Sequence, residues 1–254
     1  MNLGQTGKQV TAEYDSIALQ YQQTKKSPLR QFVESYTLLD LIGGVSGLSV
    51  LDLACGEGLY ARKVKERGAA RVLGVDISPA MIALAEEQER SHPLGIEYVC
   101  CDVRTMPDLG LFDLVIAAYL LHYAPGEAEL AEMCERIASH LGPGGRFISL
   151  NENPRQSLEQ YAGYTQYGFN KTAKAPLQDG SPIIYSLVSG REMISFTAFF
   201  YGTSTYERVF GAAGLTTVQW HPLKLSEEGL VNLGPEYWKE YMSNPPVVGI
   251  ECRR

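Results

Sequence analysis

The fold is decided by the stretch Val50-Leu-Asp-Leu-Ala-Cys-Gly-Glu-Gly-Leu-Tyr60. Its first residues are apolar apart from Asp52, which is typical of a parallel strand covered on both faces. Gly56 and Gly58 follow at once, and helix-forming residues begin at Leu59. Glycine permits positive φ and lets a ligand approach the backbone closely. The stretch therefore predicts a strand, a ligand-binding glycine turn and a helix.

Strand and helix patterns alternate on both sides of this turn. We predict helices over 59–66, from Pro79 onward with Ser78 as N-cap, and over 127–140. Strands are predicted at 48–54, 71–77, 95–101, 112–118, 146–151, 216–220 and 247–252. Alternation of this kind produces βαβ units with right-handed crossovers. We therefore expect an α/β fold with a doubly wound, mostly parallel seven-stranded sheet.

Two segments stand outside the alternation. Residues 1–45 read as two helices, the second with Ser27 as N-cap, Pro28 at its first position and an end near Ile42. Residues 152–202 lack a convincing helix, and within them 182–189 and 193–201 read as a hairpin. This segment is rich in aromatic residues, namely Tyr161, Tyr164, Tyr167, Phe169, Tyr185, Phe196, Phe199, Phe200 and Tyr201.

The chain therefore divides into three expected parts. These are a helical cap (1–45), a sheet domain (46–151 and 203–254) and an aromatic insertion (152–202) over the open end of the sheet. A capping box, Ser204-x-x-Glu207, is expected to open the helix after the insertion.

Composition limits the partners. The 254 residues carry a net charge of −7, which argues against nucleic acid or an anionic membrane as the partner. No run of 18 apolar residues is present, and residues 1–10 lack an apolar signal core. The five cysteines include no C-x-x-C pair, as expected of reduced thiols. We expect a cytoplasmic protein whose oligomeric state the sequence leaves open.

A nucleoside ligand is indicated by Asp76, which ends the second strand 20 residues after Gly56. In a βαβ unit such a carboxylate can accept both hydroxyl hydrogens of a ribose. Ala61 stands where a dinucleotide fingerprint has its third glycine, and this substitution is permitted. Asp52 and Glu57 make a poor setting for a pyrophosphate and a good one for a cationic ligand.

At this point the sequence resembles the class I S-adenosylmethionine-dependent methyltransferases over roughly residues 45–150. The matching pieces are Asp52-Leu-Ala-Cys-Gly56-Glu-Gly58, Gly74-Val-Asp76-Ile-Ser, Cys101-Asp102-Val, Phe112-Asp113-Leu-Val and Leu141-Gly-Pro-Gly-Gly-Arg. The resemblance implies a Rossmann-like methyltransferase fold. It also implies a methyltransferase activity that uses S-adenosyl-L-methionine and releases S-adenosyl-L-homocysteine.

The resemblance implies a cofactor site as well. Residues on or next to the glycine turn, including Asp52, Ala54, Gly56 and Gly58, would flank the methionine part. Asp76 would hold the ribose hydroxyls. The adenine would be contacted by Asp102, Val103, Ile77 and Met81, with Ala118 beneath the cofactor.

The flanks resemble small-molecule methyltransferases of bacterial secondary metabolism, such as the toxoflavin-biosynthesis N-methyltransferase. By this resemblance Tyr14 and Tyr21 close over the cofactor, and Arg30 pairs with its carboxylate. The tail, Pro235-Glu-Tyr-Trp238, would line the acceptor pocket. Each tyrosine could equally belong to a helical seam, and Arg30 could be a surface charge.

The remaining candidates follow strands at the ligand-binding edge of the sheet. His122, in Tyr119-Leu-Leu-His-Tyr123, could deprotonate or orient an acceptor, or simply pack against the cofactor loop. Tyr119 is grouped with it as a catalytic candidate. Glu152, Tyr167, Tyr201 and Trp238 are candidates for acceptor binding, with a loop carboxylate or a small aromatic core as the alternative readings.

We therefore expect metal-independent methyl transfer to N, O or C of a small heterocyclic or aromatic metabolite. The acceptor atom attacks the sulfonium methyl in line, so the protein mainly aligns two molecules and excludes water. No cluster of Asp and His has metal-ligand spacing. Two alternatives are an NAD-dependent oxidoreductase on the same sheet and a non-catalytic cofactor-binding member. The charge of −7 argues against a nucleic-acid methyltransferase.

Overall fold

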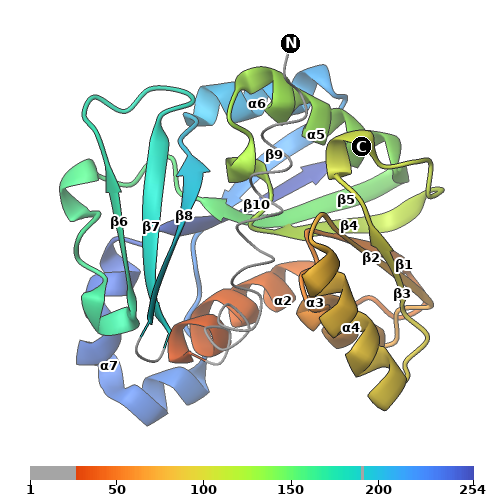
Figure 1. Ribbon diagram of the computed structural model, residues 1–254, viewed down its shortest axis with the longest axis horizontal. Helices are drawn as coiled ribbons and strands as arrows, with labels where there is room; N and C mark the ends of the chain where they lie inside the picture. The colour runs from red at the N-terminus through yellow and green to blue at the C-terminus, as the bar shows by residue number, and fades with distance from the viewer. Residues whose placement is uncertain (1–26, 190–191) are drawn as a thin grey trace.

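The computed structural model describes residues 27–189 and 192–254. Its centre is a seven-stranded sheet in the order β3-β2-β1-β4-β5-β10-β9 (Figure 1). The strands are β1 Ser49–Leu53, β2 Arg71–Asp76, β3 Glu97–Cys100, β4 Phe112–Ala118, β5 Leu141–Glu152, β9 Thr216–His221 and β10 Val247–Arg253. β1 to β5 pair in parallel, and β10 runs antiparallel to both neighbours. The expected doubly wound, mostly parallel sheet is confirmed.

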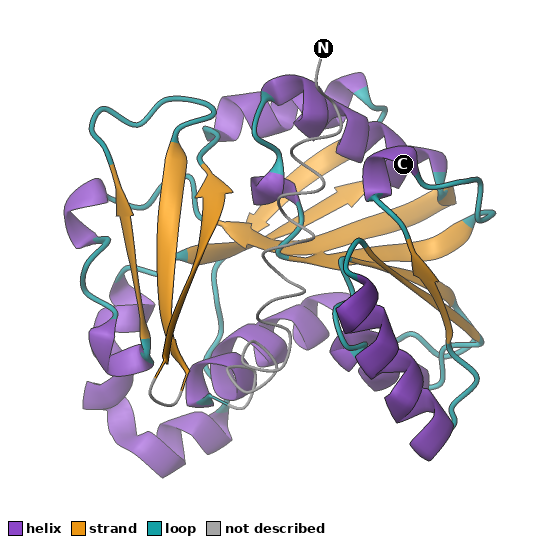
Figure 2. Ribbon diagram, viewed as in Figure 1, coloured by secondary structure: helices purple, strands orange, loops and turns teal. Residues whose placement is uncertain are grey.

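Helices cover both faces of this sheet (Figure 2). One layer comprises α2 Tyr36–Ile42, α3 Leu59–Glu66 and α4 Pro79–Ser91, and the other comprises α5 Glu127–Ser139 and α6 Thr203–Ala212. Successive side chains of β1 enter the two layers in turn. Val50 is buried with the first layer, whereas Leu51 and Leu53 are buried with the second. A strand buried on both faces explains why its sequence is apolar on both sides of Asp52.

Two helix starts agree with the sequence. Ser78 caps α4, its hydroxyl accepting the backbone N–H of Met81 at 3.2 Å, and Pro79 is the first helical residue. Ser27 plays the same part before the helical turns that begin at Pro28, accepting the N–H of Arg30 at 3.4 Å. Those turns include an unexpected π-helical segment, η1 Arg30–Ser35, which continues directly into α2.

The segment between β5 and α6 forms a second, antiparallel sheet in the order β6-β7-β8. Its strands are β6 Phe169–Ala173, β7 Pro182–Ser189 and β8 Glu192–Phe199. β7 and β8 are the expected hairpin. β6 was not anticipated, because a five-residue strand that contains Asn170, Lys171 and Thr172 has no apolar run to mark it.

One expectation about a helix was wrong, and one helix was not expected. α6 begins at Thr203 after Gly202, which caps it without a side-chain hydrogen bond, so Ser204 lies inside the helix and forms no capping box. A helix in the tail, α7 Glu227–Ser243, was not predicted. Gly234, with φ 76°, and Pro235 interrupt it at a kink, which hides the helical pattern in the sequence. In the described part of the chain, no helix is both long and apolar enough to cross a bilayer.

Candidate functional site

The glycine turn joins the carboxyl end of β1 to α3. Ala54, Gly56 and Gly58 all have positive φ, at 54°, 57° and 82°. A Cβ on Gly58 would lie 2.3 Å from the hydroxyl oxygen of Tyr98, which packs over the turn. The protein's own packing therefore demands glycine at position 58, independently of any ligand.

Asp76, at the carboxyl end of β2, holds this turn in place. Its Oδ2 accepts the backbone N–H of Gly56 at 2.8 Å, and its Oδ1 accepts that of Ser78 at 2.9 Å. The turn after β1 and the start of α4 thus meet at one carboxylate. Asp52, one residue before the end of β1, is buried beneath them.

The expected adenine-binding residues follow β2 and β3. Asp102 is engaged by Arg104, whose backbone N–H lies 2.9 Å from Oδ1 and whose Nε lies 3.1 Å from each carboxylate oxygen. Val103 is buried and opens a short 3₁₀ turn, η2 Val103–Thr105. Met81 is buried in the hydrophobic core, while Ile77 and, at the end of β4, Ala118 are partly exposed.

A pocket lies between η1, the loop after β4 and the small sheet. It holds about 720 Å³ of empty space, counting its open mouth. Its aromatic lining consists of Tyr119, Tyr123, Tyr167, Phe169, Tyr185 and Phe196. Its charged and basic side chains are Arg30, Glu34 and His122. A mainly apolar wall with a few polar groups is the usual character of a small-molecule site.

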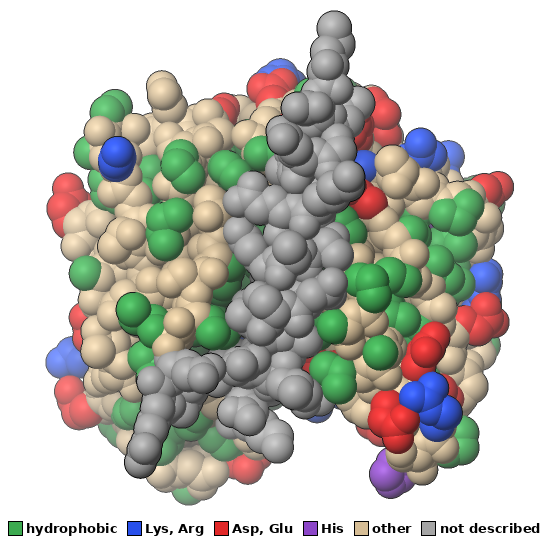
Figure 3. All heavy atoms as spheres, in the orientation of Figure 1, with side chains coloured by type: hydrophobic (Ala, Val, Ile, Leu, Met, Phe, Trp, Pro, Cys, Tyr) green, Lys and Arg blue, Asp and Glu red, His purple; other side chains and the backbone are tan. Residues whose placement is uncertain are grey.

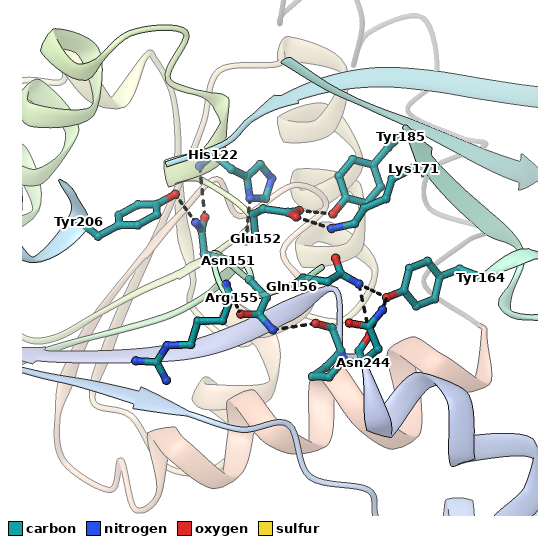
Figure 4. A network of polar contacts seen from close by, with 12 residues as sticks. His122, Asn151, Glu152, Arg155, Gln156, Tyr164, Lys171, Tyr185, Tyr206 and Asn244 are labelled. Atoms are coloured by element: carbon teal, nitrogen blue, oxygen red, sulfur yellow. Dashed lines mark hydrogen bonds and ion pairs between the residues drawn. The ribbon is translucent and has the colours of Figure 1, made fainter. Parts of the chain in front are cut away.

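His122 lies at the base of this pocket, in the 3₁₀ turn η3 Leu121–Tyr123. Its ring Nδ1 accepts the backbone N–H of Glu152 at 3.4 Å, and the backbone N–H of His122 donates to Asn151 Oδ1 at 3.2 Å (Figure 4). Burial lowers the pKa of His122 to about 3. The ring is therefore neutral at physiological pH, and because Nδ1 accepts, its hydrogen is on Nε2. Such a ring is a hydrogen-bond donor and a very weak base.

Arg30, Glu34 and Tyr119 form a group on the pocket wall. Arg30 Nε lies 3.2 Å from Glu34 Oε2, and its Cζ lies 4.7 Å from the centre of the Tyr119 ring. Tyr241 donates its hydroxyl hydrogen to Glu34 Oε1 at 3.3 Å. Glu34 was missed by sequence reasoning. Its spacing of four residues from Arg30 on a helix was the signal that could have found it.

Glu152, an expected acceptor contact, lies behind the pocket wall. Its carboxylate is hydrogen-bonded by Lys171 Nζ and by the hydroxyl of Tyr185, both in the small sheet (Figure 4). Lys171 is fully buried, and its ammonium also lies 3.9 Å from the ring centre of Tyr161. Burial lowers the pKa of Lys171, and the charge of Glu152 opposes that shift. This buried ion pair joins β5 to β6.

The other acceptor candidates occupy different places. Tyr167 lines the pocket. Tyr201 and Trp238 are outside its described lining. The Tyr201 hydroxyl donates to Ala124 O at 2.9 Å, and Trp238 Nε1 donates to Gly229 O at 2.8 Å. Trp238 instead packs behind Tyr167, with ring centres 6.5 Å apart.

Tyr14 and Tyr21 lie outside the described residues. Within 27–189 and 192–254, no three His, Cys, Asp or Glu side chains converge on a position that could hold a metal ion.

Residues 50–145 match a family model described as a methyltransferase domain. Among curated proteins, a ubiquinone biosynthesis O-methyltransferase of Acinetobacter baumannii is 26% identical over 159 residues, 59% of this chain and 65% of that protein. Another, from Coxiella burnetii, is 32% identical over 133 residues, 51% of this chain and 55% of that protein. The chain thus spans between about half and two thirds of the length of the curated relatives it matches.

Solved structures extend the likeness to almost the whole chain. An S-adenosylmethionine-dependent methyltransferase from Mesorhizobium loti superposes with a TM-score of 0.62 at 20% identity, over 91% of this chain and all of that one. The [4+2]-cyclase SpnF superposes with a TM-score of 0.64 at 16% identity, over 98% of this chain and 96% of that one. At these identities the likeness establishes the fold alone.

Proposed function

We propose that this chain, whose residues 50–145 belong to the methyltransferase domain family, transfers a methyl group from S-adenosyl-L-methionine to a small aromatic acceptor. The observation that carries the proposal is the meeting of the glycine turn with Asp76 inside that domain. Asp76, at the carboxyl end of β2, accepts the N–H of Gly56 at 2.8 Å. A carboxylate so placed suits the hydroxyls of a ribose.

The acidic residues around the turn favour a cationic nucleoside. Asp52, Asp76 and Asp102 lie within two residues of the carboxyl ends of β1, β2 and β3, which are neighbours in the sheet. Glu57 lies inside the turn itself, where a pyrophosphate would be repelled. The resemblance suggests that Gly56 and Gly58 flank the methionine part, with Ala54 beside them. It also suggests that the adenine contacts Val103, Ile77 and Met81, with Ala118 beneath it.

The chain's own contribution to the chemistry would be alignment and exclusion of water. S-adenosylmethionine supplies an activated sulfonium methyl when bound, so the acceptor needs mainly to be held in line with it. Alignment of this kind can supply roughly 7–11 kcal/mol of the barrier. The aromatic pocket beside Tyr119 is suited to that task, because its rings can hold a planar molecule in one orientation.

His122 serves in this proposal as a hydrogen-bond donor. A pKa of about 3 makes its ring a poor general base near neutral pH. Its Nε2–H is suited to orient an acceptor. We prefer the orienting role to the role of a base because the Glu152 N–H···Nδ1 bond occupies Nδ1 and leaves the ring hydrogen on Nε2.

A small metabolite suits the surface of the molecule better than nucleic acid does. On the described part of the face shown in Figure 3, basic side chains are scattered among acidic ones and form no stripe. Nucleic-acid binding requires such a basic track. We also propose that the protein is cytoplasmic. The acceptor atom in this proposal is N, O or C. The curated relatives carry the name O-methyltransferase.

The test is transfer of label from methyl-tritiated S-adenosylmethionine to a panel of phenols, hydroxyquinolines and N-heteroarenes. We expect a labelled product that forms together with an equal amount of S-adenosylhomocysteine. A folded protein that binds S-adenosylmethionine and labels none of these compounds would instead be a cofactor-binding protein without this activity.

A further inference from the structure

Two buried polar atoms of the pocket wall have no hydrogen-bond partner among the described residues. They are Glu34 Oε2 and the hydroxyl oxygen of Tyr119. Glu34 is only 4% exposed, and its Oε2 meets Arg30 Nε at 3.2 Å as an ion pair without forming a hydrogen bond. Since roughly 90% or more of buried polar groups are hydrogen-bonded, two exceptions in one pocket call for an explanation.

Glu34 and Tyr119 lie close together. Arg30 contacts both, the carboxylate through Nε and the phenol ring through the face of its guanidinium, 4.7 Å from the ring centre. Burial and then the charge of Glu34 raise the pKa of Tyr119, which keeps its hydroxyl protonated and able to donate. Glu34 also stands on the π-helical segment η1, and π-helical turns occur frequently at functional sites.

The two atoms have opposite hydrogen-bonding character. A carboxylate oxygen accepts, while the tyrosine hydroxyl can donate. A ligand that satisfies both must present a donor to Glu34 and an acceptor to Tyr119. The surrounding rings, Tyr167, Phe169 and Phe196, favour a planar molecule.

We infer that Glu34 and Tyr119 bind the methyl acceptor and determine its class: a planar aromatic molecule with a hydrogen-bond donor next to an acceptor on one edge. Aromatic lactams and hydroxyaryl carbonyl compounds have such an edge. The inference rests on the proposed function, because it takes the pocket to be the acceptor site. An analogue without the donor is rejected, since it leaves the buried Glu34 Oε2 without a hydrogen bond.

The first experiment compares two probes on the wild-type protein saturated with S-adenosylhomocysteine. 2-Quinolone carries N–H beside C=O, and N-methyl-2-quinolone has the same ring without the donor. Calorimetric titration is expected to show at least about ten-fold weaker binding of the N-methyl compound, the cost of one unsatisfied buried group. Equal affinities, or no binding of either probe, would overturn the inference.

The second experiment uses a pair of matched variants. Tyr119→Phe removes an unpartnered hydroxyl on the pocket wall, and Tyr161→Phe removes an unpartnered buried hydroxyl outside its described lining. Neither change breaks a hydrogen bond, so both proteins should unfold at denaturant concentrations no lower than the wild type. Only Tyr119→Phe should weaken 2-quinolone binding, by about five-fold or more. Equal probe affinity in the two variants would contradict the assignment.

Glu34→Gln separates the acceptor from the cofactor. The amide places N–H groups where the carboxylate accepted, so we expect weaker 2-quinolone binding and unchanged affinity for S-adenosylhomocysteine. Loss of S-adenosylhomocysteine affinity in this variant would make Glu34 part of the cofactor site and overturn the inference. Failure of the wild type itself to bind S-adenosylhomocysteine would count against the proposed function instead.

Discussion

His122 shows how burial decides the chemistry of a side chain. Its place after β4 marked it in the sequence as a catalytic candidate, because ligands bind at the carboxyl ends of strands in open α/β sheets. In the fold it is 3% exposed, its Nδ1 accepts a backbone N–H, and burial lowers the pKa of the ring to about 3. Position along the chain predicted that it would face the pocket, but protonation depends on packing.

The buried neutral ring makes stability depend on pH. An unfolded histidine binds a proton below its ordinary pKa of 6.5, whereas folded His122 stays neutral down to about pH 3. The unfolded state therefore binds more protons in this window, and stability falls as the pH falls from 6.5 towards 3. His122 should account for about 2 kcal/mol of stability lost between pH 7.5 and pH 5.

Urea unfolding at these two pH values, on the wild type and on His122→Gln, measures this contribution. The variant lacks the titrating ring and retains the other three histidines, His92, His140 and His221. It should therefore lose less stability on acidification than the wild type. Parallel losses in the two proteins would show that His122 is already accessible to protons.

At the scale of elements, the β1–α3 turn is held by packing against β3. Gly58 has φ 82°, and a Cβ there would lie 2.3 Å from the Tyr98 hydroxyl oxygen. Gly58→Ala should destabilise the protein by about 1–2 kcal/mol for the left-handed backbone and by about 1–3 kcal/mol more for the clash.

Gly168→Ala is the matched control for this change. Gly168 has φ 84° and ψ 15°, close to the 82° and 20° of Gly58, and nothing lies within 4 Å of a Cβ, so only the backbone cost applies. Tyr98→Phe should recover part of the stability lost in Gly58→Ala, because it removes the nearest clashing atom. Denaturant midpoints of the two single variants and the double variant give the comparison. Equal destabilisation by the two alanines would argue against the clash.

The ion pair of Lys171 and Glu152 joins the two sheets. Removing one partner leaves a buried charge, which typically costs about 3–5 kcal/mol. Lys171→Met should therefore destabilise the protein by this order in denaturant unfolding. The exposed Lys174, three residues along the chain, is the control. Lys174→Met should change stability by no more than about 0.5 kcal/mol, and similar losses in both variants would show that the pair stabilises nothing.

The sequence could predict the elements that local patterns mark, but not those that depend on long-range packing. β4 and β7 occupy the expected residues, because continuous apolar or alternating runs identify them without reference to neighbours. β6 and α7 were missed because each depends on tertiary partners. β6 is held by its pairing with β7 and by the buried Lys171, and the kinked α7 is anchored by Trp238 Nε1 bonded to Gly229 O at 2.8 Å.

At the scale of the whole molecule, some residues of the candidate site could be predicted from the sequence and others could not. The residues that surround the glycine turn were predictable, since the carboxyl ends of neighbouring strands meet at one edge of the sheet. Glu34 was not, because its role depends on η1 packing beside Tyr119, 85 positions away in the chain. Glu152 and Trp238 were expected to face the acceptor. The fold gives the former a partner in the second sheet and buries the latter behind Tyr167.

The central claim is that the edge around Asp76 binds a cationic nucleoside. Asp113→Ala provides a matched control for Asp76→Ala. The Asp113 carboxylate accepts two hydrogen bonds from Ser49, at 2.8 and 2.7 Å, near the amino end of β4. The two variants therefore remove similar hydrogen bonds from opposite ends of the sheet.

The most direct measurement is calorimetric titration of S-adenosylhomocysteine into the wild type, Asp76→Ala and Asp113→Ala. We expect one molecule bound per chain, affinity reduced several-fold or more by Asp76→Ala, and affinity unchanged by Asp113→Ala. Absence of binding by the folded wild type, or equal affinity in all three proteins, would contradict the central claim.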